Sequence, residues 1–385
     1  KRTLGVYRHG SEGGRVVPIE KGSDREYRVA SADRHEAQDG ELVEIETLRG
    51  SKFGLQRAKI VARLGDVGAP RSISLIAIHE HGIPTEFPEN VLTEAQQAKP
   101  VTGLKGREDL RDIPLVTIDP ADARDHDDAV YAEPDTDSGN KGGFILWVAI
   151  ADVSHYVAPG SALDQEAAQR GNSVYFPARV VPMLPEALSN GLCSLKPAVD
   201  RLAMVCEMEL SAKGVLSKYR FYEAVIHSHA RLTYTQVGEV LENGKHPDVD
   251  KRRVPDLKRL HSLYRVLRAA RDKRGAIDFE TVETRIIFDD NRKIDAIVPV
   301  VRNDAHKLIE ECMLCANVAT ARFYDANQLP MLFRVHEGPS EEKLEGLRKF
   351  LGELGLDLGG GAKPTPLDYQ HLLQQITDRD DAHVI

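Results

Sequence analysis

Five aspartates crowd one short stretch of the sequence. They stand at positions 119, 122, 125, 127 and 128 of the segment TIDPADARDHDDAV, which covers residues 117–130. Carboxylates held this close repel one another, and the repulsion is relieved by water, by protonation, by basic partners or by bound cations. Arg124 and His126 are the basic residues of the segment, and they do not balance five acids. The segment therefore predicts either a solvated acidic turn or a cation site.

The flanking residues favour a cation site. Apolar IPLVTI precedes the cluster and AVYAE follows it, which predicts carboxylates between two strands at the edge of a sheet. Oxygen ligands of this kind suit Mg²⁺, with Mn²⁺ as a substitute, and Mg²⁺ also recruits phosphate oxygens of a substrate. Two such ions could clamp the attacking and leaving oxygens of a phosphodiester. A calcium loop is disfavoured because no register supplies both the required glycine and the closing glutamate.

Two other motifs carry no chemistry in our interpretation. Cys312 and Cys315 form a CxxC within an apolar helical stretch that has no second cysteine pair nearby. This setting favours buried packing over a zinc or redox site. The glycine-rich GLDLGGGAKPT at 355–365 lacks the spacing of a phosphate-binding loop, so it predicts a connection between helices.

Length and composition are those of a globular protein with room for more than one domain. The chain has 385 residues, of which 41% are hydrophobic and 29% charged. Four cysteines and the lack of an apolar signal segment predict a reducing, cytoplasmic location. No apolar run approaches roughly 18 residues, so we expect no membrane span. The formal net charge of -9 neither supports nor excludes nucleic-acid binding by itself.

Three regions follow one another along the chain. Residues 1–70 contain five short β-runs separated by turn residues, which predicts a small five-stranded barrel. Residues 71–110 predict a connector, in which SISLIAIHEHGIP forms a helix or strand and the polar remainder is interrupted by Pro and Gly. Residues 111–385 carry α/β signals. Among them, FILWVAIADVSHYV at 144–157 is apolar enough for a strand buried on both faces.

Several helices carry their own start and stop signals. One has Pro255 in its first turn and Gly275 at its end. Another starts behind Asp304 and is apolar over much of its circumference, which predicts a central buried helix. A third begins at Ser340 with two glutamates in its first turn. The sequence stops at Ile385 without a helix-ending signal, so we expect that it is cut inside a domain.

Several long motifs resemble the catalytic domain of the ribonuclease II family, the RNB domain. They run in the family's order from about residue 105 to the end: the aspartate segment, LWVAIADVSHYV, RGNSVYFPARVVPMLPEALSNGLCSLKP, FYEAVIHSHARLTY and RNDAHKLIEECM. The amino-terminal barrel resembles the cold-shock domain that precedes the catalytic domain in this family. The resemblance implies an α+β multidomain chain, with a cold-shock-like OB barrel before an α/β RNB domain that is cut at its carboxyl-terminal end.

The resemblance also implies an activity. The family hydrolyses single-stranded RNA from the 3′ end, processively and without sequence preference, to nucleoside 5′-monophosphates with Mg²⁺. It implies a cytoplasmic exoribonuclease that acts as a monomer on RNA 3′ ends. Two alternatives stay open. One is an RNA-binding fragment that lacks hydrolysis because part of the catalytic domain is missing; the other is a different two-metal nuclease or phosphatase, which would not explain the collinear motifs.

The family's aspartate motif falls on four of the five acids. These are Asp119, Asp125, Asp127 and Asp128, and Asp122 lies outside the motif. The resemblance implies that Asp119 and Asp128 hold one ion with help from Asp125. It implies that Asp127 serves the second ion and the water that this ion activates.

Further positions match residues of the family that contact RNA. The motif SVYFP places a base-stacking tyrosine at Tyr175, and ARLTY places Tyr234 near the terminal nucleotide. Phe279 in IDFE matches a stacking phenylalanine, and Glu311, or its neighbour Glu310, matches a residue that lines the pocket. Stacking on aromatic rings tolerates any base, which suits degradation without sequence preference. Core packing is the alternative for each aromatic residue.

Overall fold

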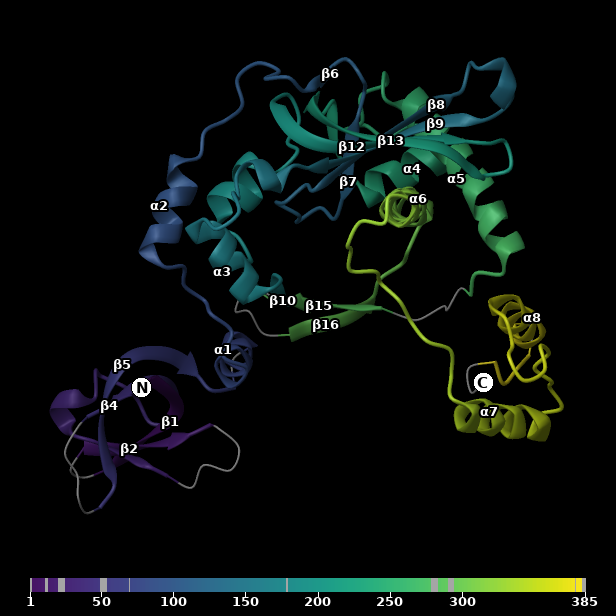
Figure 1. The fold of residues 1–385 in the computed structure, drawn as a ribbon. Helices are drawn as coiled ribbons and strands as arrows, with labels where there is room; N and C mark the ends of the chain where they lie inside the picture. Colours follow the sequence, from purple (N-terminus) through teal and green to yellow (C-terminus); the bar gives the residue numbers. More distant parts are fainter. Residues whose placement is uncertain are drawn as a thin grey trace. The chain divides into compact units, whose positions relative to one another are not determined.

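The computed structural model divides the chain into two compact units (Figure 1). It describes residues 2–10, 13–19, 25–48, 54–68, 70–177, 179–277, 283–289, 294–377 and 379–382. The first unit consists of Lys1–Ala98, Val157–Glu186 and Val282–Val300. The second consists of Lys99–Tyr156, Ala187–Thr281 and Val301–Ile385. Each unit is therefore built from segments that lie far apart in the sequence.

The first unit begins with the predicted five-stranded barrel, which is confirmed. It is closed in the order β1-β2-β3-β5-β4. The strands are β1 (Arg2–Gly10), β2 (Gly13–Pro18), β3 (Tyr27–Val29), β4 (Glu41–Thr47) and β5 (Gln56–Asp66). Apolar side chains fill the interior: Tyr7, Val16, Val29, Val43, Ile45, Ala58 and Ile60. Gly14 is needed where the barrel is tightest, because a Cβ there would lie 2.4 Å from the Tyr7 ring.

Helices and two hairpins complete the first unit. They are α1 (Pro70–Glu80), α2 (Glu89–Gln97), α3 (Ala162–Arg170), β10 (Val174–Phe176) with β11 (Arg179–Val181), and β15 (Thr284–Phe288) with β16 (Ile294–Pro299). The choice between helix and strand after residue 70 is thus settled as a helix. The polar stretch behind it also contains α2, which buries Val91 and Ala95 and packs on α3. The two apolar positions were too few to predict this helix from sequence.

Buried Arg170 holds this part of the first unit together. Its guanidinium donates hydrogen bonds to the carbonyls of Pro84 at 2.8 Å and Glu86 at 2.7 Å. It also lies 3.8 Å from the centre of the Phe87 ring, and Nε pairs with Glu166 at 2.8 Å. One side chain therefore fixes the segment before α2 to the end of α3.

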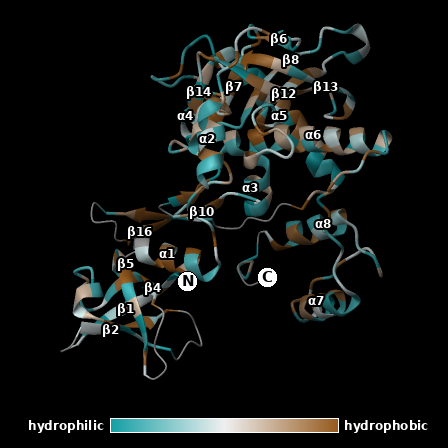
Figure 2. Cartoon of the chain, turned by 60° about the vertical axis from the view of Figure 1, so that its left-hand side comes forward, coloured by the Kyte–Doolittle hydropathy of each residue, from teal (hydrophilic) through white to brown (hydrophobic). Residues whose placement is uncertain are grey.

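A seven-stranded mixed sheet is the centre of the second unit. Its strand order is β14-β7-β8-β9-β12-β13-β6. The strands are β6 (Glu108–Leu110), β7 (Val116–Asp119), β8 (Asp128–Pro134), β9 (Phe144–Ala151), β12 (Asp200–Leu210), β13 (Leu216–His227) and β14 (Ala230–Thr233). Neighbours pair antiparallel except at the two outer positions, where β14 is parallel to β7 and β6 to β13. Apolar residues are concentrated in the central strands (Figure 2), and residues 146–149 of β9 are buried as predicted.

Three helices pack against this sheet. They are α4 (Tyr234–Asn243), α5 (Val254–Arg274) and α6 (Asp304–Ala326). The predicted limits of α5 are confirmed, and Gly275 ends it with a φ of 77°, a conformation in which glycine is favoured. A buried core of strand and helix residues joins the helices to the sheet, and Cys312 belongs to it. The packing interpretation of the CxxC is thus confirmed for Cys312.

The prediction of a central buried helix holds for one side of α6 only. One side contributes Leu308, Ile309 and Cys312 to the core. Its other side exposes Leu314, Val318 and Phe323. Phe323 still packs its ring against Phe221 of β13, with 5.3 Å between the ring centroids. The sequence shows how much of a helix is apolar, but not how many layers surround it.

Two further helices form a small cluster of their own. They are α7 (Glu341–Glu353) and α8 (Pro366–Ile376), with a core of Leu344, Leu351, Leu358, Leu372 and Ile376. Ser340 caps α7 by accepting a hydrogen bond from the Lys343 backbone, as its position predicts. Short 3₁₀ turns at Ser31–Asp33, Ser138–Asn140 and Val153–His155 and a π-helix at Ala187–Leu192 complete the elements. Among the described residues, no helix has the length and apolar character to cross a membrane.

Candidate active site

The pairing of β7 with β8 brings the predicted aspartates to one end of these two strands. β7 ends at Asp119 and β8 begins at Asp128, and the two strands run antiparallel with Val116 opposite Val130. Residues 120–127 therefore connect the two strands and reverse the chain direction at this end. They include Asp125, half-buried, and Asp127, exposed, between the two strand ends. Asp122 is exposed to solvent.

The connection between β7 and β8 is held by hydrogen bonds from other elements. The buried hydroxyl of Ser194 accepts from the His126 backbone N–H at 3.1 Å and donates to the Arg124 carbonyl at 3.1 Å. The Asp127 carbonyl accepts from the Ala151 N–H at 2.8 Å. On the other side, Arg231 donates to the carbonyls of residues 121 and 123 at 2.9 and 3.2 Å. The aspartates thus lie on a fixed loop.

His126 is a part of the site that the sequence interpretation missed. Its side chain is 4% exposed, and its Nδ1 lies 2.9 Å from Oδ2 of Asp119, which is 14% exposed. The signal was present, because His126 lies inside the aspartate segment. From the sequence alone, we interpret His126 only as a possible counter-charge. Ser194 was also missed, although it lies in one of the family-like motifs.

Burial raises the pKa values of Asp119, Asp127 and Asp128, and repulsion between carboxylates adds to the rise for Asp127 and Asp128. Burial, then the charges of Asp119 and Asp127, raises the pKa of Asp128 to about 6. Desolvation by the surrounding protein raises the pKa of Asp127, and the charges of Asp125 and Asp119 raise it further. Part of the Asp127 side chain stays exposed. Burial also raises the pKa of Asp119, against the opposing effect of His126.

The charge of the cluster is left unbalanced by the protein. Among the described residues, no Lys or Arg forms an ion pair with Asp125, Asp127 or Asp128. Within the same ranges, no group of three or more His, Cys, Asp or Glu side chains is placed so that it could hold a metal ion. Oxygen donors that do not complete a shell fit Mg²⁺, which keeps several waters and shares substrate phosphates. The carboxylates therefore suit the predicted cation by their chemistry, whereas the described side chains do not form a preassembled metal site.

Tyr234 lies beside the aspartates. It is the first residue of α4, whose cap is Thr233, the register partner of Asp119 on β14. Its pKa is raised to about 12 by burial and then by the charges of Asp128 and Asp119. The ring stacks on His306 of α6 with 4.0 Å between centroids. Tyr234 thus joins the predicted group through its backbone position and its electrostatics.

Tyr175 belongs to the first unit and lies on the hairpin of β10 and β11. Its side chain is 68% exposed, and its register partner Val180 is exposed as well. An exposed ring is not packed in a core, so the core-packing alternative for Tyr175 is wrong. Phe279 lies outside the described residues.

Glu311 is buried in an ion pair. It is 5% exposed, and its carboxylate lies 3.1 Å from Nη1 of Arg271 on α5. Burial raises its pKa in spite of this partner. The neighbouring Glu310 pairs with Arg271 at 3.5 Å and with Arg302. Glu311 also borders a cavity of about 530 Å³ between α5, α6 and the start of β13.

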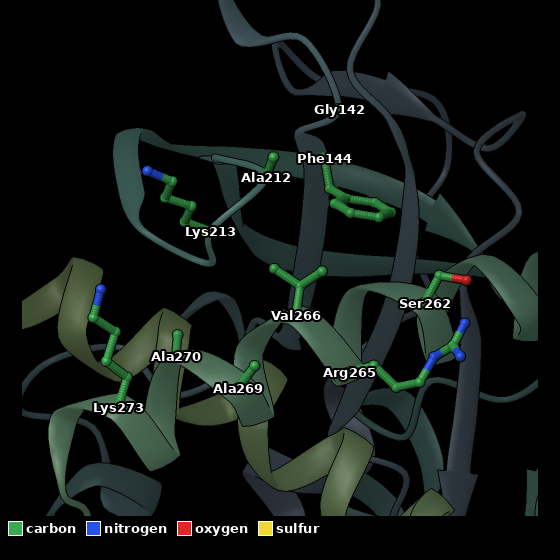
Figure 3. Close-up of a pocket in the computed structure, with 10 residues that line it drawn as sticks. All are labelled: Gly142, Phe144, Ala212, Lys213, Ser262, Arg265, Val266, Ala269, Ala270 and Lys273. Carbon is green, nitrogen blue, oxygen red and sulfur yellow. The ribbon is translucent and has the colours of Figure 1, made fainter.

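Figure 3 shows a second cavity of the second unit. It has a volume of about 730 Å³ and is bordered by Phe144, by Val266 of α5 and by three basic residues, Lys213, Arg265 and Lys273. Phe144 begins β9, whereas Ile150 near the end of the same strand pairs with Asp128. The cavity therefore does not include the aspartate site.

Family models match both parts of the chain. Residues 107–384 match the model described as RNB domain, and residues 16–88 match the model described as Cold shock domain. Proteins named Ribonuclease R are similar in sequence. That of Vibrio cholerae is 54% identical over 96% of this chain and 45% of its own length, and that of Escherichia coli is 51% identical over 90% and 42%. The chain thus spans about half the length of these relatives.

Solved structures share the fold. Mycoplasma genitalium RNase R in complex with double-stranded RNA has a TM-score of 0.87 and 29% identity, over 100% of this chain and 68% of its own. Yeast Ssd1, described as a pseudonuclease, has a TM-score of 0.65 and 17% identity, over 99% of this chain and 48% of its own. The second likeness concerns the fold alone, and it indicates that the fold is compatible with loss of nuclease activity.

Proposed function

The chain belongs to the ribonuclease II and R family, which is defined by the RNB domain, and from this premise we propose that it hydrolyses single-stranded RNA from the 3′ end. The products are nucleoside 5′-monophosphates, released processively and without sequence preference. One observation carries the proposal. Asp119, Asp127 and Asp128 lie at one end of the paired strands β7 and β8 with raised pKa values, and no Lys or Arg among the described residues forms an ion pair with Asp127 or Asp128.

We assign the metal-binding role to the four aspartates of the motif. Asp119 and Asp128, with help from Asp125, would hold one Mg²⁺, and Asp127 would serve a second. Bound Mg²⁺ supplies a hydroxide-like water and neutralises charge on the phosphodiester. The protein's own contribution is to hold the carboxylates together on a fixed loop before any cation arrives. Hydrogen bonds from Ser194, Ala151 and Arg231 support this role.

RNA binding rests on aromatic side chains in this proposal. The exposed ring of Tyr175 offers a face to a base, and stacking contributes roughly 1–3 kcal/mol per base. Tyr234 would contact the terminal nucleotide, since the charges of Asp119 and Asp128 act on its phenol. Phe279 and Glu311 stay predictions.

We propose the domain limits on the same basis. A cold-shock-like barrel covers 1–70, a connector 71–110 and the RNB-type catalytic domain 111–385. A cytoplasmic location and a monomeric state also belong to the proposal. The match of two family models in this order supports the division into a barrel and a catalytic part.

Two charge-matched substitutions test the metal assignment. Asp127→Asn removes a negative charge but keeps the shape of the side chain, so we expect single-turnover hydrolysis in Mg²⁺ to fall by about a hundredfold or more. RNA affinity should hold or rise slightly, because the site then repels phosphate less. Asp122→Asn removes the same charge from the same loop, at an exposed position outside the motif, and should leave the rate within a few fold.

Rate and binding are measured together for both variants. A general electrostatic effect of the acidic loop predicts equal losses, and equal rates for the two variants would refute the two-metal assignment. Wild-type chain that binds RNA without hydrolysing it in Mg²⁺ would establish the alternative, an RNA-binding protein. The likeness to a pseudonuclease is what keeps this alternative worth testing.

A further inference from the structure

We propose that His126 is a positioning residue that orients Asp119 for a divalent cation, and that Ser194 fixes His126 for this task. The inference deepens the proposed function and rests on it. It concerns the hydrogen bond between the two side chains and does not require a charge on the imidazole.

The first support is the geometry of the imidazole. Nδ1 of His126 lies 2.9 Å from Oδ2 of Asp119. An ionised carboxylate only accepts hydrogen bonds, so Nδ1 carries the proton and donates it to Oδ2. Both side chains are shielded from water, at 4% and 14% exposure. A hydrogen bond in such surroundings is directional and little weakened by solvent.

The second support is the restraint on the His126 backbone. Its N–H donates to the Ser194 hydroxyl at 3.1 Å, and its carbonyl accepts from the Leu195 N–H at 2.8 Å. Ser194 is fully buried, and its own carbonyl accepts from Nε of Arg201 on β12 at 2.8 Å. The imidazole is therefore tied through residues 194 and 195 to the neighbouring part of the sheet.

The third support is what the carboxylates would do without this restraint. Asp119 and Asp128 stand at the same end of the paired strands β7 and β8, and Asp127 directly precedes Asp128, so the ionised carboxylates repel one another. In the absence of a cation, the same repulsion favours rotation of the Asp119 side chain away from its neighbours. A hydrogen bond from a fixed donor resists that rotation. Groups that orient a metal ligand in this way typically change metal affinity by about 10–100-fold.

The test measures metal affinity directly on the 385-residue chain. Calorimetric titration with Mn²⁺ gives the affinity, and urea unfolding in EDTA gives the stability of the metal-free protein. His126→Phe keeps a buried ring but removes the donor, and we expect about tenfold weaker Mn²⁺ binding. His126→Asn restores an N–H donor near the position of Nδ1, so it should recover most of the affinity. His371→Phe, at an exposed site on α8, is the control and should bind as the wild type does.

Two results would overturn the inference. One is wild-type Mn²⁺ affinity in a folded His126→Phe variant, and the other is no recovery in His126→Asn. If His126→Phe does not fold, Ser194→Ala takes its place and should weaken Mn²⁺ binding by a few fold. Unchanged Mn²⁺ affinity in Ser194→Ala would refute the role of Ser194 in fixing His126. Asp119→Asn distinguishes failure of this inference from failure of the proposed function. Unchanged Mn²⁺ affinity in that variant would contradict the proposed metal site itself.

Discussion

Asp128 carries a charge that the metal-free protein accommodates poorly. Its pKa of about 6 lies well above the ordinary value of 3.8, because the carboxyl is desolvated and faces Asp119 and Asp127. Such groups reduce the stability of the metal-free protein, so proteins retain them where function needs them. The cost should be visible in unfolding experiments without metal.

A raised pKa means that the folded state prefers the protonated carboxyl. The resulting stabilisation is fully present below the ordinary pKa and is lost as pH rises through about 6. Above pH 7, ionised Asp128 should therefore cost up to about 3 kcal/mol. Asp128→Asn removes this cost, so in EDTA we expect the variant to be more stable than wild type at pH 7.5 and equal to it at pH 4.

Urea unfolding in EDTA at several pH values measures this difference. Addition of Mg²⁺ should then stabilise the wild type more than the variant, because the variant lacks a ligand. A stability difference that does not change between pH 4 and pH 7.5 would contradict the assigned cause.

Sequence reasoning named the acidic residues of the candidate site but missed two residues that form hydrogen bonds within it. The four aspartates and Tyr234 could be named because their types and motifs are distinctive. His126 and Ser194 could not be assigned partners, since Ser194 lies 68 positions along the chain from His126. The hydrogen bond between them forms because the fold places the segment after the π-helix at Ala187–Leu192 beside residues 124–126.

At the scale of elements, the hairpin of β10 and β11 presents Tyr175 to solvent. Its ring is 68% exposed, so removing it should cost little stability. A ring that stacks on a base of the RNA also sets how short an oligonucleotide can still be held. Tyr175→Ala should therefore change the length of the final undegraded oligonucleotide more than it changes the unfolding midpoint.

Val180 provides a control within the same hairpin. It is the register partner of Tyr175 and is also exposed. Val180→Ala should leave the length of the final product unchanged, and gel analysis of exhaustive digests compares the two variants. A Tyr175→Ala variant that mainly unfolds, with the same final product, would show that the ring serves the structure of the hairpin.

Elements with local signals were predicted well. The five barrel strands were bounded by turn residues, and α5 and α7 by capping residues. The order of the strands in the seven-stranded sheet was not predictable, because it depends on pairings between distant segments such as β14 with β7. The exposed side of α6 could not be foreseen for the same reason, since it depends on the packing of other elements around the helix.

For the whole molecule, fold and activity have to be considered separately. The chain shares its fold both with an RNase R bound to RNA and with a protein described as a pseudonuclease. The second likeness concerns the fold alone, so a shared fold does not by itself establish hydrolysis. The chain also spans about half the length of its ribonuclease R relatives, so hydrolysis by this chain needs a direct measurement.

The most direct measurement follows RNA that is labelled at either end and incubated with the chain in Mg²⁺ or in EDTA. Hydrolysis from the 3′ end predicts that a 3′ label appears at once as mononucleotide, while RNA with a 5′ label shortens gradually. Neither change should occur in EDTA, because the four aspartates then lack the ions that activate water. Early release of internal fragments, or cleavage that persists in EDTA, would contradict the proposed metal-dependent 3′ exoribonuclease.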